Sequence, residues 1–115
     1  MSNLNRDHNR VVWFDLPVVD LDRAVTFYRN VLNIEVSIES FGEIRFAVLA
    51  HNEGNGGCLV VQPENVGTQG PMMYMNVHGR LHDAVKQAQM QGGKVLEPIH
   101  PIGPHGYRAL VLDSE

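Results

Sequence analysis

The stretch RVVWFDLPVVDLDRAVTFYRNVLNI, residues 10–34, decides the fold because it predicts one strand, a tight turn and one amphipathic helix. The strand is the apolar run 11–16, and Pro17 limits it since proline cannot donate to a ladder. Asp20 is a good helix N-cap, and Asn33 suits a left-handed stop. Between them, apolar residues recur at helical spacing: Leu21, Ala24, Val25, Tyr28, Val31 and Leu32. One stripe of the predicted helix therefore faces a sheet.

The composition of the chain limits the number of domains and the kinds of partner that we expect. The chain has 115 residues, is 43% hydrophobic and 19% charged, and suits one globular domain. A formal net charge of -4 without a run of Lys or Arg gives no reason to expect nucleic acid or a membrane surface as partner. Nothing approaches the roughly 20 apolar residues of a membrane span, so we expect a cytoplasmic protein. The first eight or so residues are expected to be a flexible leader.

The rest of the first half predicts three strands. Residues 34–41 and 43–50 alternate apolar and polar side chains, and Gly42 lies between them at a short hairpin turn. Residues 58–61 form a third strand that Pro63 stops. The single cysteine, Cys58, lies in this apolar run, where a buried, inert thiol is expected.

The second half repeats this order. Residues 71–77 predict a strand, and a helix follows until Gly92 and Gly93, with apolar residues at Leu81, Ala84, Val85 and Ala88. Residues 94–98 and 107–113 predict two strands, with a loop rich in Pro and Gly between them. An offset of 59 residues pairs Trp13 with Met72 and Asp15 with Tyr74.

The predicted fold class is α+β. Two beta-alpha-beta-beta-beta modules form an open, cup-like mixed sheet, with a helix on one face of each module and a shared concavity on the other. We expect a single domain over residues 1–115, with module one at about 10–63, a linker at 64–70 and module two at about 71–115. The last strand of module two is absent from this sequence, and is truncated, disordered or supplied by a partner chain.

These segments, together with the ending IGPHGYRALVLDSE, resemble the glyoxalase/bleomycin resistance/dioxygenase superfamily, also called vicinal oxygen chelate proteins. The similarity extends from about Arg10 onward and is greatest to the small glyoxalase-like branch of unassigned activity. It implies paired modules in an eight-stranded cup, usually in a homodimer. An open sheet edge at the missing strand also favours a homodimer.

The resemblance further implies a divalent metal, which the ligand positions do not support. The position of the first ligand is Trp13, which cannot bind a metal, and its counterpart in module two is Met72, a poor ligand for such ions. A further ligand, commonly Glu on the eighth strand, would follow Glu115. Since a catalytic site needs about three protein ligands, we expect a site with no metal and no other cofactor.

Other side chains are candidates for a ligand site. Alternation places Trp13, Asp15, Met72 and Tyr74 on the inner side of the cup. Asp15 is a carboxylate in an apolar strand, so it has an unseen partner or faces a wet cavity, and it is the candidate catalytic residue. Other candidates lie near the rim of the cup: Gln62, His105 and Tyr107. For the aromatic residues core filling is the simpler role, and for His105 it is an exposed loop position.

Three functions are compatible with the sequence. The first is a metal-independent small-molecule binding protein with an apolar cup. The second is a metal-dependent lyase, isomerase or dioxygenase with Asp15 as general base. The third is a drug-sequestering resistance protein, for which acidic balance and aromatic residues are compatible but unspecific.

Overall fold

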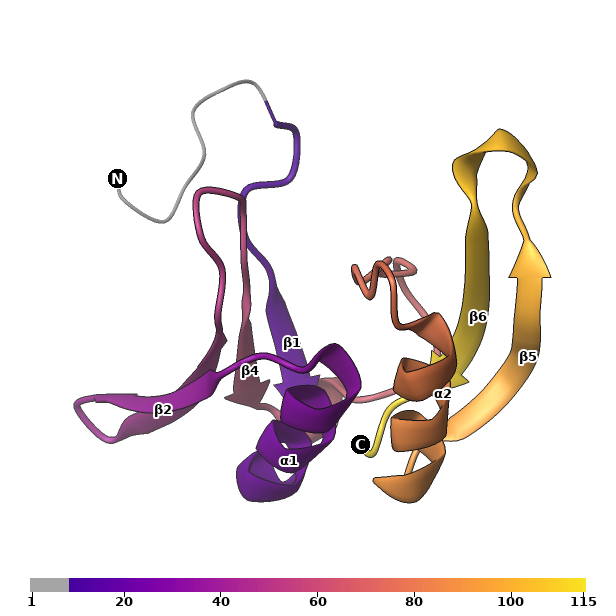
Figure 1. Ribbon diagram of the computed structural model, residues 1–115. Coiled ribbons are helices and arrows are strands. Elements are labelled where there is room, and N and C mark those ends of the chain that lie inside the picture. Colours follow the sequence, from indigo (N-terminus) through magenta and orange to yellow (C-terminus); the bar gives the residue numbers. More distant parts are fainter. Residues whose placement is uncertain (1–8) are drawn as a thin grey trace.

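The computed structural model describes residues 9–115, so the predicted leader lies outside the described residues. Figure 1 shows two groups of strands standing on either side of a pair of helices. Module one contains β1 (Asp15–Val18), α1 (Leu21–Leu32), β2 (Val36–Phe41), β3 (Ile44–Leu49) and β4 (Cys58–Val61). Module two contains α2 (Leu81–Met90), β5 (Lys94–Pro101) and β6 (Tyr107–Leu112). Neither helix in 9–115 is both long enough and apolar enough to cross a membrane.

Strand β1 begins and ends later than the sequence predicts. Pro17 lies inside the strand rather than after it. The sheet order is β1-β4-β3-β2, so β1 is an edge strand, paired in parallel with β4. The carbonyls of Phe14 and Val18 accept from backbone amides on the β4 side, at Cys58 and Gln62. The nitrogen of Pro17 therefore points to the open edge, where a missing donor costs no ladder bond.

Helix α1 confirms the predicted caps. The carboxylate of Asp20 accepts from the backbone amide of Arg23 at 3.0 Å, and Asn33 ends the helix with a φ of 54°. The predicted hairpin at Gly42 is also confirmed, since β2 and β3 pair antiparallel on either side of it. These local signals were sufficient because each acts within a few residues of chain.

The two faces of the module-one sheet differ. Helix α1 packs on one face, which we call the outer face, where Val18, Ala47 and Leu59 are completely buried. The other face, the inner face, carries the alternate residues of the same strands. Met75, Val77 and Val111 of module two pack against the same core, so one core joins the outer faces of both modules.

Module two contains fewer strands than the sequence predicts. Residues 71–77, predicted as a strand, have no strand assignment, and that prediction is wrong for this chain. In module one β4 lies between β1 and β3, whereas the described residues of module two include no strand in the equivalent place beside β6. Without that neighbour, residues 71–77 have no ladder to join.

The β5–β6 hairpin is longer than predicted. Pairing of Pro101 with Tyr107 extends β5 into the segment expected to be a loop, and the bond from Ile102 N to Gly106 O closes the turn. Two irregularities in register accompany the additional residues of β5. Cross-strand pairing here outweighs the local preference of Pro and Gly for irregular structure.

Module two contacts α1 at the C-terminal end of the helix. The guanidinium of Arg80 donates to the carbonyls of Val31 at 2.5 Å and Asn30 at 3.3 Å. Cations at this end of a helix are stabilised because the last carbonyls have no partner within the helix. Arg80 also pairs with Asp83 at 2.5 Å, which fixes the guanidinium at the start of α2.

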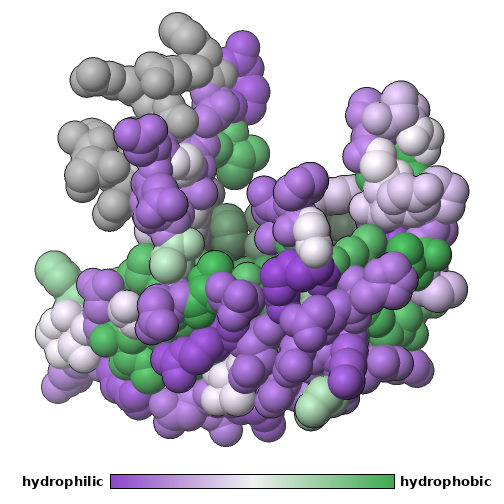
Figure 2. Space-filling model, in the orientation of Figure 1, coloured by the Kyte–Doolittle hydropathy of each residue, from purple (hydrophilic) through white to green (hydrophobic). Residues whose placement is uncertain are grey.

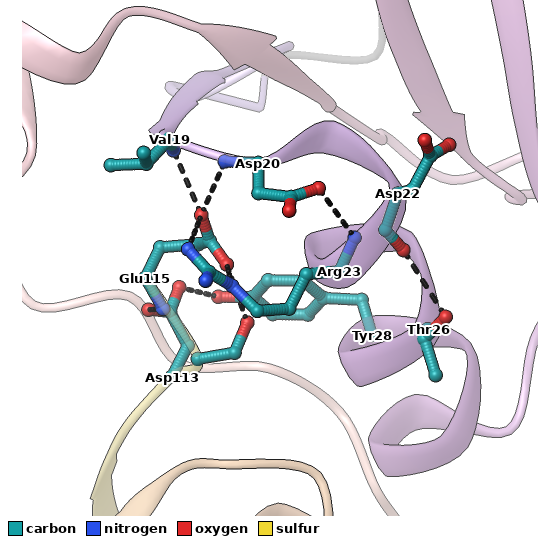
Figure 3. A network of polar contacts seen from close by, with 9 residues as sticks. Val19, Asp20, Asp22, Arg23, Thr26, Tyr28, Asp113 and Glu115 are labelled. Carbon is teal, nitrogen blue, oxygen red and sulfur yellow. Dashed lines mark hydrogen bonds and ion pairs between the residues drawn. The ribbon is translucent and has the colours of Figure 1, made fainter.

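The final residues of the sequence contact the other end of α1 (Figure 3). Glu115 Oε1 accepts from the backbone amides of Val19 at 2.8 Å and Asp20 at 2.7 Å, and Oε2 pairs with Arg23 Nε at 2.7 Å. Burial opposes ionisation, but the hydrogen bonds from Arg23 and the Asp20 amide outweigh it and lower the pKa of Glu115 to about 2. The side chain of Glu115 is only 1% exposed, so this carboxylate is an internal part of the fold.

A second bond lies beside this carboxylate. The hydroxyl of Tyr28, in the middle of α1, donates to Asp113 Oδ2 at 2.5 Å, and burial raises the pKa of Tyr28. The other carboxylate oxygen of Asp113 accepts from the backbone amide of Glu115 at 2.9 Å. Asp113 therefore fixes the turn that presents Glu115 to the helix.

We predict that Glu115→Gln destabilises the fold by about 1–2 kcal/mol at pH 7, because a charged acceptor is lost from donors of four residues, Val19, Asp20, Arg23 and Ser114. The folded pKa lies below the ordinary value of 4.5, so the stabilisation is complete above that value and is lost as the pH falls toward 2. Urea unfolding at pH 7 and pH 3 measures the difference. Glu43→Gln, at the exposed β2–β3 turn, is the control, and an equal loss at both pH values would contradict the assignment.

We predict that Gly93→Ala destabilises the fold by about 1–3 kcal/mol through overpacking. A Cβ at Gly93 would lie 2.5 Å from the Leu112 carbonyl oxygen and 2.8 Å from the Phe27 ring. Urea midpoints measure the effect, and Gly54→Ala is the matched control because nothing lies within 4 Å of its Cβ position. Equal midpoints for the two variants would contradict close packing between the modules at Gly93.

Candidate functional site

The candidate site lies on the inner faces of the two modules, which the helices do not cover. Figure 2 shows the surface hollowed between the strands of module one and the β5–β6 hairpin. Register defines the inner face of module one: Asp15 pairs with Cys58 and Cys58 with Val48, while Phe46 pairs with Val60. Four large apolar residues on this face are only partly buried: Trp13, Phe46, Val48 and Val60. The inner face of module one is therefore an apolar surface without a complete covering.

The thiol of Cys58 connects two of the predicted site residues. Cys58 Sγ donates to Asp15 Oδ1 at 3.1 Å. Burial and the adjacent Asp15 carboxylate raise the pKa of Cys58 to about 11, although a hydrogen bond with Trp13 opposes the shift. Cys58 is therefore a protonated thiol, and its predicted burial is confirmed.

The environment of Asp15 explains how the inner face of module one accommodates a carboxylate, and Trp13 beside it makes a further ring contact. The side chain of Asp15 is exposed, so its charge keeps contact with water while it accepts from the thiol. The ring of Trp13 meets His51 edge to face, with centroids 5.7 Å apart. Asp15 and His51 thus lie at a polar margin beside the apolar surface of module one.

The inner face of module two is organised by Arg108. Its Nη1 donates to the hydroxyl of Tyr74 and approaches Met72 Sδ at 3.9 Å, and its guanidinium carbon lies 5.7 Å from the centre of the Tyr74 ring. Its Nε donates to His100 Nε2 at 3.0 Å. Glu97 Oε1 lies 3.9 Å from Arg108 Nη2 and 3.6 Å from His100 Nε2. Two predicted site residues, Met72 and Tyr74, thus meet at a cation.

This arrangement defines the tautomer of His100. Arg108 Nε is always a donor, so His100 Nε2 is the acceptor and carries no proton. The remaining ring proton is on Nδ1, which donates to the carbonyl of Pro98 at 2.7 Å. His100 is therefore neutral and oriented on both sides.

We predict that ¹⁵N NMR at pH 8 shows His100 as the Nδ1–H tautomer, because Arg108 occupies Nε2. Exposed histidines in water favour the other tautomer, so His78, which is exposed in the turn before α2, is an internal control. A predominantly Nε2–H signal from His100 would contradict the Arg108 geometry.

The remaining predicted site residues lie apart from these two groups. Gln62 follows β4, and its side-chain oxygen accepts from Asn65 at 3.1 Å. His105 is exposed in the short 3-10 turn Gly103–His105 at the tip of the β5–β6 hairpin. Tyr107 lines a shallow hollow at the start of α2, with Leu81 and Ile99. Because Tyr107 precedes Arg108 in the strand, its side chain is on the opposite face of the hairpin.

The donor set does not fit a divalent metal. Such a site needs about three oxygen, nitrogen or sulfur ligands that converge on one point. No group of three His, Cys, Asp or Glu side chains in residues 9–115 meets this condition. Trp13 and Met72 stand at the two positions where the resemblance implies ligands, and neither side chain suits that role.

The sequence left open whether Arg108 reaches a ligand or solvent, and it did not predict the network around Arg108. Arg108 and His100 lie in different strands, and their pairing depends on the register of β5 with β6, which two irregularities alter. Glu97 gave no signal either, since it looks like an ordinary solvent-facing acid. The one available hint was an arginine within the apolar run of residues 107–112, where a charge requires a partner.

Comparisons with known proteins agree with this architecture. Residues 10–37 match the profile described as bleomycin resistance protein-like N-terminal. A glyoxalase/bleomycin resistance protein/dioxygenase family enzyme from Burkholderia phytofirmans PsJN has a similar structure, with a TM-score of 0.65 and 19% identity over 90% of this chain and 89% of that chain. Comparison with curated protein sequences gave no significant match.

Two further solved structures are similar. A glyoxalase-related enzyme from Fulvimarina pelagi has a TM-score of 0.65 and 18% identity over 92% of this chain and 81% of that chain. Glyoxalase I from Zea mays has a TM-score of 0.56 and 16% identity over 90% of this chain and 45% of that chain. Similarity at this level of identity establishes the fold and leaves the activity to be argued from the site.

Proposed function

We propose that this chain, which its fold and opening segment assign to the glyoxalase/bleomycin resistance/dioxygenase superfamily, binds a small organic molecule without a metal ion. The molecule would have an apolar body and would lie against the inner faces, which the helices leave uncovered. The superfamily name covers enzymes and resistance proteins alike, so the proposal rests on the surfaces of this chain.

One observation carries the proposal, namely the contrast between the two faces of the module-one sheet. Outer-face residues beneath α1, such as Val18 and Leu59, are 0% exposed, whereas Trp13 and Val60 on the uncovered inner face are only partly buried. Grouped apolar side chains without a covering element are typical of ligand sites, since burying them is favourable by about 25 cal/mol per Å². The exposed side chains of Met72 and Tyr74 provide a second apolar surface in module two.

The chemistry of the donor set supports binding without a metal. The convergent groups on the inner faces are a thiol with a carboxylate, and a guanidinium with an imidazole. Neither group provides the three anionic or imidazole ligands of a metal centre. Asp15 remains the candidate general base if a reaction takes place, since it is the exposed carboxylate on the inner face of module one.

Binding of the neutral probe N-phenyl-1-naphthylamine tests the proposal. We expect saturable enhancement of its fluorescence with quenching of Trp13, the single tryptophan. Val60→Lys should weaken binding by about tenfold or more, because it places a charge on the apolar inner face. Val61→Lys is the matched control, since Val61 is the next residue of β4 and is 47% exposed on the other face.

The outcomes separate the three functions. Equal loss in both lysine variants, or no saturable binding, would contradict an inner-face site. We expect EDTA to leave probe binding unchanged. Stoichiometric retention of nickel, zinc, iron or manganese after desalting would instead support a metal-dependent enzyme. Protection of a host strain against bleomycin-like or other cationic drugs would support sequestration.

A further inference from the structure

We propose that Arg108 binds the acidic group of the ligand, so that the molecule bound by this chain is an apolar organic anion, most simply a carboxylate. This inference rests on the proposed binding function and specifies its ligand class. It predicts that the anionic group contacts Arg108 and that the apolar body lies against the neighbouring side chains of Met72 and Tyr74.

The hydrogen bonds of Arg108 leave part of the guanidinium available. Of its donors, Nε is used by His100 and Nη1 by Tyr74. Its Nη2 has Glu97 at 3.9 Å, which is an ion pair without a hydrogen bond. The side chain of Arg108 is 27% exposed, so a ligand can reach the guanidinium from solvent. A guanidinium suits a carboxylate because its planar donors match the two oxygens.

Glu97 shows that this part of Arg108 accepts a carboxylate. Glu97 Oε1 lies near both Nη2 of Arg108 and Nε2 of His100, and its side chain is 49% exposed. An exposed pair of this kind contributes little to stability, so a ligand carboxylate with an apolar body can displace it at little cost. Glu97 is thus an internal competitor for the anionic group.

The orientation of Arg108 also favours binding. His100 holds Nε, and the hydroxyl and ring of Tyr74 contact the guanidinium from another side. A side chain that is already ordered loses less conformational entropy when it binds a ligand. Tyr74 and Met72 then extend an apolar surface next to the cation. An anionic group and an apolar body are thus accommodated side by side.

The overall charge of the protein allows the preference for an anion to be assigned to a local cation. The chain has a formal net charge of -4, so general electrostatics disfavour an anion relative to a neutral molecule of the same shape. A preference for the anion therefore requires a local cation. On the inner face of module two, the cation beside Met72 and Tyr74 is Arg108.

The test compares two probes with the same aromatic body. 8-Anilinonaphthalene-1-sulfonate is N-phenyl-1-naphthylamine with an added sulfonate, so the ratio of their dissociation constants isolates the anionic group. We expect the sulfonate to bind about tenfold tighter to the wild-type chain, as one charge-assisted contact permits. Decanoate should displace it more effectively than decanamide, which shows that a carboxylate has the same preference.

Three variants assign the preference to its residues. Arg108→Gln should remove the tenfold preference for the sulfonate, measured as the ratio of the two dissociation constants. Arg45→Gln, on the outer face beside Asp22, should change neither value and is the matched control. Glu97→Gln should tighten sulfonate binding by about threefold, because the competing carboxylate is gone. Urea midpoints verify that each variant is folded.

The results distinguish failure of this inference from failure of the proposed function. Saturable binding of both probes with equal affinity in the wild-type chain would overturn the anionic ligand and leave the binding function intact. A preference that persists in Arg108→Gln would place the cation elsewhere and overturn the assignment. If neither probe binds, both the function and its ligand class are contradicted.

Discussion

The carboxylate of Glu115 at the start of α1 is the interaction on which the arrangement of the two modules depends. It accepts from two backbone amides that the helix leaves unpaired and also pairs with Arg23. Arg80 occupies the other end of the same helix and donates to its last carbonyls. Both contacts come from module two, and both complement the helix dipole. Helix α1 is therefore a shared element, held at each end by the module to which it does not belong.

The packing of both modules around α1 decides which faces of the sheets are left uncovered. Since the outer faces are packed around α1 and α2, with Phe27 close to Gly93, the inner faces are directed away from the core. The apolar residues there are not required for the contact between the modules. They remain available to a ligand.

The two inner faces have different chemistry, although they belong to modules of similar order. Module one offers apolar side chains beside a protonated thiol and a carboxylate, whereas module two offers an arginine ordered by an imidazole and a phenol. A cation beside the exposed side chains of Met72 and Tyr74 suits the amphipathic anion proposed above. The fold alone does not decide the ligand, which depends on the residues at these positions.

The sequence by itself determined the elements whose signals are local. Asp20 and Asn33 set the ends of α1, Gly42 set a hairpin, and the buried state of Cys58 followed from its apolar neighbours. Each of these depends on contacts within a few residues, which a linear pattern records. The superfamily resemblance added the paired modules, because it covers the order of the elements.

Only the tertiary structure decided the features that join distant residues. The predicted strand at 71–77 is not formed, because a strand exists only where a neighbouring strand completes its ladder. The contacts of Glu115 with α1 span more than ninety positions of sequence, and those of Arg108 with Tyr74 depend on how β6 is placed beside residues 71–77. Such pairings follow from the register and packing of whole elements, so no periodicity in the sequence reports them.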